Sequence, residues 1–390
     1  MKINKAFKYR IYPNRKQREY LAKEFGCSRF VYNYFLRQRI DFYAANKDGA
    51  KKGLNYFDNA RALTQLKPEF EWLKEVNSQS LQQALRDLDV AYNNFFNKRA
   101  AFPRFKKKRN KQSFSAPQHW SINEGKLDIP KCKGIKIILH RQVEGVTKSV
   151  TVSQTPSGRY YASILCEVDI PDPEYSGGEV GLDYGIKSFI TTSDAEVVES
   201  PNFLRESEKK LKQLQRRISG KQKGSANRQK AVKRLARQHE KVSNQRQDFL
   251  HKTSIQLVRD NQAIYIESLA ISNMIKNHCL AKSISDSGWN TFVNMLEYKG
   301  SWYGCHINKV DRFFPSSKRC HVCGYINDNL TLSIREWQCP ECNTNHDRDL
   351  NAAINILTFG RAGTARNNAC GEAVQQDPSA KQEAPAFKRE

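Results

Sequence analysis

The stretch Val180-Gly181-Leu182-Asp183-Tyr184-Gly185 decides the fold of the C-terminal half of this 390-residue chain. Together with the later run Phe189-Ile190-Thr191-Thr192 it predicts a strand, a turn and a second strand. Asp183 stands near the end of the first strand between two glycines, which let backbone or substrate approach closely. Its carboxylate is therefore a candidate catalytic group, although an ordinary turn aspartate explains Asp183 equally well when it is taken alone.

Two further carboxylates have comparable positions. Glu267 ends the apolar run Ala263–Ile266, which predicts a short buried strand, and Asp349 lies in His346–Leu357, near the start of a predicted helix that ends at Gly360. Taken singly, Glu267 could pair with an arginine, and Asp349 could cap its helix or complement the helix dipole. Two strand-end carboxylates and one on a later helix are together what an RNase H-type fold uses to hold two Mg²⁺ or Mn²⁺ ions.

Four of the ten cysteines form two Cys-x-x-Cys pairs separated by fifteen residues. This spacing is typical of a tetrahedral zinc site, and four thiolates leave no open position on the metal. We therefore expect a structural zinc held by Cys320, Cys323, Cys339 and Cys342. His321 and His346 are weaker alternative ligands, and a redox role fits less well because one pair would suffice for it.

The charge of the chain indicates a polyanionic partner. Lys and Arg total 65 against 40 Asp and Glu, a formal net charge of +25 that favours nucleic acid over a surface kept charged for solubility. No run of eighteen apolar residues predicts a membrane span, and the start of the chain lacks the apolar core of a signal peptide. The scattered cysteines suit a reducing compartment, so we expect a cytoplasmic protein.

Two segments concentrate this positive charge. Phe102–Lys111 is an aromatic and basic loop, and Arg205–Arg246 predicts a helical pair with 15 Lys and Arg against three acidic residues. A one-signed excess favours a surface that follows phosphates over a merely solvated helix face. The candidate nucleic-acid contacts are Lys106, Lys107, Lys108, Arg109, Lys111, Arg216, Arg217, Lys233, Arg234 and Arg237.

The N-terminal half alternates between two periodicities. A first strand that ends before Pro13 is followed by two amphipathic helices, one with Asn14 as its predicted N-cap and one over Leu81–Phe95. Residues 127–168 return to a period of two. The simplest assembly is a β-barrel that the first strand begins and that is finished after a helical insertion. The composition of Pro171–Gly178 predicts a linker at the main domain boundary.

The order of these motifs resembles that of TnpB proteins, transposon-encoded nucleases regarded as ancestors of type V CRISPR effectors. The resemblance rests on Val180–Lys187, Ile266–Leu269, the two cysteine pairs and His346–Ala353, with support from Phe102–Lys106 and Lys276–Asp286, and covers most of residues 1–360. It implies a RuvC catalytic triad of Asp183, Glu267 and Asp349, with Asp347 ranked below Asp349. Ser268 departs from the Asp or Asn often found there in the family, which puts the tuning of the metal site in doubt rather than metal binding.

The resemblance also implies a multidomain α+β architecture. A wedge-like, OB-like β-barrel would comprise residues 1–13 and 101–172, with a helical recognition insertion over 14–100. An RNase H-like α/β nuclease of the RuvC type would comprise residues 177–314 and 346–360, interrupted by a zinc-binding segment over 315–345. The composition of residues 361–390, rich in Ala, Gln, Asn, Glu and Pro, predicts a disordered tail.

The implied function is RNA-guided cleavage of DNA in a bacterial cell. A guide RNA transcribed from the transposon end would read the double-stranded target, while the protein reads a short motif beside it. A catalytically silent RNA-guided regulator would be marked by the loss of a carboxylate, and none is lost. A strand-transferring transposase predicts the order Asp, Asp, Glu, whereas the order here is Asp, Glu, Asp. A zinc-ribbon nucleic-acid-binding protein without chemistry would leave the three carboxylates without a use.

Overall fold

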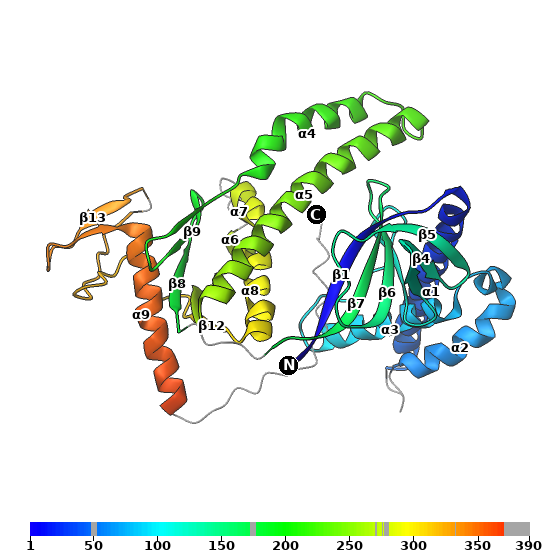
Figure 1. Cartoon of the computed structure of the whole chain (residues 1–390), viewed down its shortest axis with the longest axis horizontal. Coiled ribbons are helices and arrows are strands. Elements are labelled where there is room, and N and C mark those ends of the chain that lie inside the picture. The colour runs from blue at the N-terminus through cyan, green and yellow to red at the C-terminus, as the bar shows by residue number, and fades with distance from the viewer. Residues whose placement is uncertain are drawn as a thin grey trace. The chain divides into compact units, whose positions relative to one another are not determined.

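The computed structural model describes residues 1–47, 53–171, 177–269, 271–274, 276, 281–331 and 333–369, and the chain divides into two compact units (Figure 1). The N-terminal unit comprises Lys2–Asp169 together with Val232–Arg237. The C-terminal unit comprises Met1, Ile170–Ala231 and the chain from Gln238 onward. Residues 172–176 of the predicted linker, and 277–280 of one segment that resembles TnpB, lie outside the described residues.

An antiparallel sheet of seven strands, in the order β2-β6-β7-β1-β5-β4-β3, forms the base of the N-terminal unit. The strands are β1 (Lys2–Tyr12), β2 (Gln112–Ala116), β3 (Ser121–Asn123), β4 (Lys126–Ile129), β5 (Cys132–Ile138), β6 (Val146–Gln154) and β7 (Tyr160–Asp169). The first strand of the chain lies in the middle of the sheet, where β1 pairs with β7 and β5. The sheet is therefore begun by β1 and completed after the helical segment.

This sheet curls into an open half-barrel, which confirms the curled sheet of the predicted β-barrel but only half of the barrel. Closure would require the edge strands β2 and β3 to pair, and no such pairing is present among the described residues. Helices α1 (Arg15–Ala45) and α3 (Ser78–Phe96) pack against β2. The Phe25 ring of α1, for example, lies 5.5 Å from the Phe114 ring of β2. Helix packing thus takes the place of strand pairing at this edge.

The helical segment begins where the sequence predicts. The Asn14 side chain accepts a hydrogen bond from the Gln17 backbone N–H at 2.9 Å, and the Asn14 N–H donates to the Gln17 side chain at 2.8 Å. This capping box starts α1 directly after Pro13 ends the first strand. α2 (Tyr56–Glu69), the 3₁₀ turn η1 (Glu71–Lys74) and α3 complete the bundle around a core that includes Phe35, Leu63 and Leu85.

A mixed sheet of five strands, in the order β10-β9-β8-β11-β12, organises the C-terminal unit. Its strands are β8 (Glu179–Tyr184), β9 (Ser188–Thr192), β10 (Val197–Glu199), β11 (Ala263–Glu267) and β12 (His306–Val310). β8, β9 and β10 pair antiparallel, whereas β11 runs parallel to both β8 and β12. The predicted strand–turn–strand unit and the predicted strand that ends at Glu267 are both confirmed.

The described residues of the C-terminal unit also form helices. They are α4 (Phe203–Ser219), α5 (Ala226–Asp260), α6 (Ile271–Met274), α7 (Ala281–Ser287), α8 (Trp289–Tyr303) and α9 (Arg348–Ala369). The core joins Leu182 and Ile266 of the sheet to Trp289 and Phe292 of α8, all of which are buried. No helix among the described residues is long and apolar enough to cross a membrane.

The last helix runs further than the sequence predicts. We expected α9 to end at Gly360, but it continues to Ala369, so residues 361–369 of the predicted tail are helical. Gly360 is a packing position rather than a helix end, since a Cβ built on it would lie 2.2 Å from Cδ1 of Tyr265. Arg361 then pairs with Glu179 of β8. The rest of the predicted tail, residues 370–390, lies outside the described residues.

Candidate functional site

The strands that carry Asp183 and Glu267 are neighbours in the C-terminal unit. β8 and β11 are parallel, and Leu182 lies opposite Ile266. Asp183 and Glu267 follow these two residues, so both carboxylates stand at the same carboxyl end of the sheet. The buried apolar residues before each of them fix the strands in the core.

Asp349 reaches this edge because α9 packs directly on β8. Gly181 makes the close approach possible: a Cβ built there would lie 2.2 Å from the Ala353 backbone oxygen and 2.8 Å from the Leu357 nitrogen. Residues four apart share one face of a helix, so Asp349 lies on the same face of α9 as Ala353. Gly181 therefore allows α9 to pack on β8, and this packing brings Asp349 toward Asp183 and Glu267.

The electrostatics connect the three carboxylates. Burial, followed by the negative charges of Asp349 and Glu267, raises the pKa of Asp183 to about 7, against a smaller opposing effect of Arg348. Burial also raises the pKa of Glu267, although a hydrogen bond from the Ser316 hydroxyl to its Oε1 at 3.3 Å opposes this. A partly buried set of like charges is stabilised by a divalent cation, so this donor set fits Mg²⁺ or Mn²⁺.

Asp347 has a different role from Asp349. Its Oδ1 accepts hydrogen bonds from the backbone N–H groups of Asp349, at 3.0 Å, and Leu350, at 2.9 Å. Asp347 thus caps the N-terminus of α9, which is the structural role that the sequence left open for Asp349. The Asp349 side chain instead accepts from Arg335, whose Nη1 lies 2.9 and 3.1 Å from its two oxygens.

The four predicted zinc ligands come together. Among the described residues, Cys320, Cys323, Cys339 and Cys342 form the one group of metal-binding side chains whose ligand atoms all lie within 4.8 Å of one another. The Sγ atoms of Cys320 and Cys342 are 3.6 Å apart, and those of Cys323 and Cys339 are 3.5 Å apart. A tetrahedral zinc with bonds of about 2.3 Å places its sulfurs about 3.8 Å apart. The cluster therefore has the size of a structural zinc site.

Two similar backbone turns create this cluster. In the first, the Gly324 N–H donates to the Cys320 carbonyl at 3.0 Å, and in the second, the Asn343 N–H donates to the Cys339 carbonyl at 2.9 Å. Gly324 and Asn343 both have left-handed φ values, +83° and +56°, which these turns require. The short strand β13 (Glu336–Gln338), which ends just before Cys339, pairs with β14 (Asn345–Asp347), which leads directly into α9.

The two histidines beside the cluster make hydrogen-bond contacts and lie outside the set of four metal-binding side chains. His346 is buried with its Nε2 3.1 Å from the Cys320 sulfur, and burial lowers the pKa of its ring. A neutral ring can donate to a thiolate without replacing it as a ligand. The Nδ1 of His321 lies 3.0 Å from the Asn351 side-chain oxygen. Neither histidine belongs to the group of converging ligand atoms.

Several contacts of this region were not predicted. Asn351 and Asn355 are buried on α9, and their amide groups donate to the Arg319 carbonyl at 2.7 and 2.6 Å. Asn355 also donates to the Ser316 carbonyl at 2.9 Å. The available signal was a pair of asparagines, four residues apart, on an otherwise apolar helix face. Nothing in the local pattern indicated Arg335.

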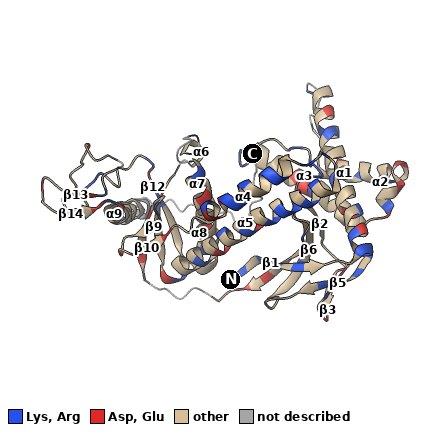
Figure 2. Ribbon diagram, turned by 90° about the horizontal axis from the view of Figure 1, so that it is seen from above, with Lys and Arg blue, Asp and Glu red and all other residues tan. Residues whose placement is uncertain are grey.

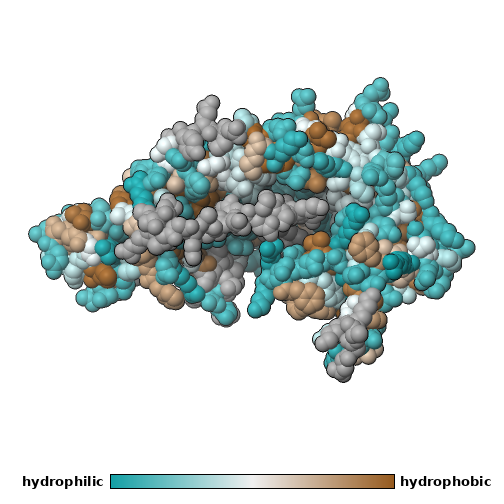
Figure 3. All heavy atoms as spheres, turned by 90° about the horizontal axis from the view of Figure 1, so that it is seen from below, coloured by the Kyte–Doolittle hydropathy of each residue, from teal (hydrophilic) through white to brown (hydrophobic). Residues whose placement is uncertain are grey.

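The predicted nucleic-acid contacts lie on exposed surfaces of both units. All ten are exposed, and Figure 2 shows that Lys and Arg follow α4 and α5 along their length. The face shown in Figure 3 is mostly hydrophilic, with its hydrophobic side chains in small separate patches. The basic loop is fixed to α1, since the backbone of Lys106 exchanges hydrogen bonds of 2.7 and 3.0 Å with the Asn33 side chain.

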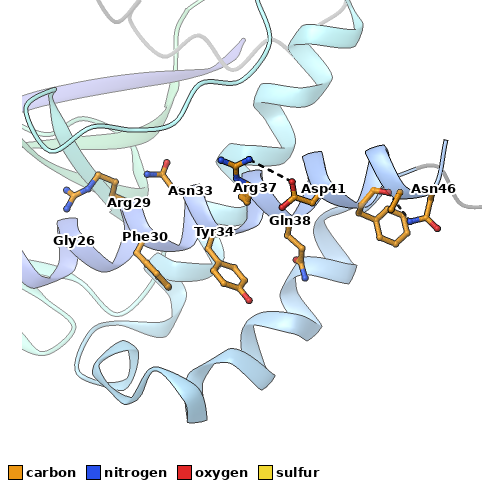
Figure 4. Close-up of a pocket in the computed structure, with 11 residues that line it drawn as sticks. Gly26, Arg29, Phe30, Asn33, Tyr34, Arg37, Gln38, Asp41 and Asn46 are labelled. Atoms are coloured by element: carbon orange, nitrogen blue, oxygen red, sulfur yellow. Dashed lines mark hydrogen bonds and ion pairs between the residues drawn. The ribbon is translucent and has the colours of Figure 1, made fainter.

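A concave pocket with a volume of about 870 Å³ lies along α1, and the residues that line it lie between Gly26 and Asn46. Figure 4 shows Arg29, Asn33 and Arg37 on one side of the helix and Phe30 and Tyr34 on the other. The aromatic side continues to Phe70, whose ring lies 5.2 Å from that of Phe30. On the basic side, the Arg37 guanidinium lies 5.4 Å from the Phe105 ring of the basic loop. We call this surface the α1 groove.

Comparison with known proteins identifies the family. The chain is 40% identical over 380 residues to a Streptomyces pristinaespiralis protein provisionally named an RNA-guided DNA endonuclease, and covers 92% of its length. It is 36% identical over 403 residues to InsQ of Escherichia coli K12, which carries the same provisional name, and covers 98% of it. The chain belongs to the TnpB family. The model of the IS605 OrfB family, described as a probable transposase, matches residues 163–278.

Two further family models match parts of this TnpB protein. A model of the TNB domain of Cas12f1-like proteins matches residues 289–356, which include all four cysteines and Asp349. A helix-turn-helix model matches residues 1–48, and the described residues of this stretch, 1–47, form one strand followed by the helix α1. Among solved structures, a chain of the Cas12f1–sgRNA–target DNA complex matches with a TM-score of 0.47 and 14% identity, over 91% of this chain and 98% of that one.

Proposed function

We propose that this TnpB protein is an RNA-guided DNA endonuclease that hydrolyses target DNA beside a short recognition motif with two divalent metal ions. The observation that carries the proposal is geometric: Asp183 and Glu267 follow paired residues at the carboxyl ends of β8 and β11, and α9, which carries Asp349, packs on β8. Asp349 is not needed as a helix cap, because Asp347 fills that role. The full-length relatives that are named as RNA-guided DNA endonucleases support the same function.

The strand order supports an RNase H-like fold for the C-terminal unit. Three antiparallel strands followed by two parallel ones, with helices between them, place β8 in the centre of the sheet beside β11. We propose residues 177–314 and 346–360 as the RuvC-like nuclease and residues 315–345 as its zinc-binding segment. Residues 1–13 and 101–172 would form the wedge domain, and residues 14–100 the helical recognition insertion.

In this mechanism the carboxylates of Asp183, Glu267 and Asp349 hold the two Mg²⁺ or Mn²⁺ ions. When bound, such ions activate a water molecule and stabilise the leaving 3′ oxygen of the phosphodiester. The chain itself contributes the position of each carboxylate. Gly181 brings α9 onto β8, and the Ser316 hydroxyl orients Glu267 from the start of the zinc segment. Asp183 must release its proton for metal binding, so we expect activity to rise with pH near its pKa of about 7.

The cysteine cluster would hold a structural zinc with no part in the chemistry. Four thiolates would close the coordination shell, and the hydroxyl and backbone N–H of Thr344 lower the pKa of Cys342, which favours its thiolate. The zinc would fold the β13–β14 hairpin and, through Asn351 and Asn355, fix the start of the zinc segment to α9. The zinc would thereby help to fix the position of α9, which carries Asp349, without contacting the three carboxylates.

Guide RNA and double-stranded DNA would bind along the basic surfaces. The exposed residues of Phe102–Lys111 and of α4 and α5 supply positive charge for phosphates, and the α1 groove adds aromatic rings beside arginines. A guide RNA transcribed from the transposon end would supply the sequence information. We propose a cytoplasmic location in a bacterial cell, beside the chromosomal DNA.

Co-purification of the protein with RNA expressed from the transposon end tests this function. Sequencing of the bound RNA should give one defined species, and the complex should cut matching duplex DNA in the presence of Mg²⁺. Asp183→Ala should bind the same RNA without cutting. RNA-programmed binding with no cleavage by the unaltered protein would favour the silent regulator, and the absence of a specific RNA would reject the guided function.

A further inference from the structure

Arg335 joins the zinc-binding segment to the candidate nuclease site. It lies between the two cysteine pairs, yet its Nη1 lies 2.9 and 3.1 Å from the two carboxylate oxygens of Asp349. The Arg335 side chain is 52% exposed and that of Asp349 is 24% exposed, so the pair lies at the surface of the site. Both oxygens that a cation would use on Asp349 accept hydrogen bonds from one guanidinium.

Backbone pairing fixes Arg335 in this position. β13 pairs Glu336 with Asp347, and the Arg348 N–H donates to the Arg335 carbonyl at 2.8 Å, which continues the pairing by one residue. Arg335 therefore lies opposite Arg348, the neighbour of Asp349. The folded hairpin places the guanidinium beside the third carboxylate before any metal is bound.

The ion pair is not needed to attach the zinc segment to α9. Asn351 and Asn355 already provide buried hydrogen bonds to the carbonyls of Ser316 and Arg319, and the His321 backbone N–H donates to Asn351 at 3.1 Å. These bonds lie among buried groups, whereas the Arg335 contact is half-exposed. A purely structural account of Arg335 therefore leaves unexplained why it engages both oxygens of Asp349.

We propose that Arg335 is a positioning residue that holds Asp349 in the metal-free protein and must release it when a divalent cation binds. A guanidinium and a metal ion compete for the same carboxylate lone pairs, and each offsets the repulsion among Asp183, Glu267 and Asp349. Arg335 thus keeps the carboxylates in place and weakens the first binding of metal. This inference rests on the proposed metal-dependent nuclease function.

Mn²⁺ affinity of the zinc-loaded, RNA-free protein tests the inference without any cleavage assay. The free Mn²⁺ signal in electron paramagnetic resonance, titrated at pH 8, gives the Kd for the full chain and for Arg335→Gln, Arg335→Lys and Lys318→Gln. Lys318 is the matched control, because it carries the same charge in the same segment but donates to the Asp328 carbonyl. Equal zinc content in all four proteins shows that the hairpin is intact.

Arg335→Gln should bind Mn²⁺ about threefold to tenfold more tightly than the unaltered protein, because the competing cation is gone. Arg335→Lys, which keeps the charge on a differently shaped and more flexible side chain, should fall between the two, and Lys318→Gln should not change the Kd. Unchanged or weaker binding by Arg335→Gln would overturn the inference, as would an equal gain in Lys318→Gln.

An Asp183→Asn protein separates failure of the inference from failure of the proposed function. It should lose most Mn²⁺ binding if the cation occupies the three carboxylates. Binding that survives Asp183→Asn places the cation elsewhere and overturns both the metal site and the role of Arg335. Loss of binding in Asp183→Asn without a gain in Arg335→Gln keeps the nuclease site and overturns the inference alone.

Discussion

The cysteine cluster and the carboxylate site differ in how completely the folded chain prepares them for a metal. The cysteine sulfurs already lie 3.5 and 3.6 Å apart in pairs, close to the separation that zinc imposes. The three carboxylates share one edge of the sheet, but they repel one another, and Asp349 is engaged by Arg335. Backbone turns form the cysteine cluster, whereas the proposed nuclease site retains an electrostatic repulsion that a bound metal would relieve.

The largest expected effect comes from breaking the prepared site. Cys339→Ser should abolish zinc binding and unfold the β13–β14 hairpin, because metal binding contributes on the order of 10 kcal/mol to such sites. Mass spectrometry of the metal content and limited proteolysis of residues 320–347 measure this loss. Cys305→Ala, a buried cysteine outside the cluster, should keep its zinc and serves as the control. Full zinc occupancy in Cys339→Ser would contradict the assignment.

A second prediction concerns the packing that carries Asp349 to the other carboxylates. Gly181→Ala should lower the free energy of unfolding by about 3 kcal/mol, because its Cβ would overlap the α9 backbone. DNA cleavage should fall with it, since α9 must move. Gly26→Ala is the matched control, because no atom lies within 4 Å of its added Cβ, and helix propensity should make it neutral or stabilising by up to about 1 kcal/mol. Denaturant unfolding measures both variants, and only Gly181→Ala should be destabilised.

The third prediction concerns the pH dependence of the stability of the metal-free protein, which should reveal the repulsion among the carboxylates. The pKa of Asp183 is raised to about 7, so the metal-free protein should lose stability as pH rises from about 4 to 7 and should then level off. Asp183→Asn should flatten this dependence and be more stable at pH 8. The raised pKa sets a ceiling of about 4 kcal/mol, and solvent near the half-buried group reduces the expected gain to about 1–2 kcal/mol.

Denaturant midpoints at pH 5 and pH 8 provide the measurement. Asp248→Asn, whose side chain is 63% exposed on α5, is the control and should follow the unaltered protein at both pH values. Mg²⁺ should stabilise the unaltered protein at pH 8 and leave Asp183→Asn almost unchanged. An Asp183→Asn protein that is less stable than the unaltered one at pH 8 would show that the carboxylates are not under strain.

The smallest expected effect concerns the surfaces rather than the metal sites. Replacement of Arg216 and Arg217 by glutamine should weaken the salt dependence of nucleic-acid binding. The negative slope of log K against log salt should become less steep by roughly 0.9 for each phosphate that the protein no longer neutralises. Fluorescence anisotropy at several salt concentrations measures the slope. Lys252→Gln is the control, because Lys252 is exposed but paired with Asp248 on the same helix. An unchanged slope in the double variant would remove α4 from the binding surface.

Local patterns in the sequence predicted the parts of the fold that depend on them. The strand that ends at Glu267, the Asn14 cap and the four cysteines all follow from neighbouring residues, and the structure contains each of them. The predicted barrel is only a half-barrel, because closure depends on whether two distant edge strands pair. The α9 extension was missed because Gly360 serves packing against Tyr265, which only the tertiary structure reveals.

The same distinction applies to the candidate site. Asp183, Glu267 and Asp349 were predicted from strand ends and a helix start, and the fold brings them to one edge of a sheet. Arg335 was missed because it reaches Asp349 through hairpin pairing over a span of fourteen residues. No local pattern distinguishes it from the other exposed basic residues of the chain.

Anomalous X-ray diffraction tests the central claim most directly, because it locates each metal on its own absorption edge. Crystals of the protein with guide RNA and an uncleavable target DNA, soaked with Mn²⁺, should show zinc within the four cysteines. Manganese should lie between Asp183, Glu267 and Asp349, with Arg335 withdrawn from Asp349. Manganese bound away from these three carboxylates, or Arg335 still paired with Asp349 while the metal is present, would contradict the account.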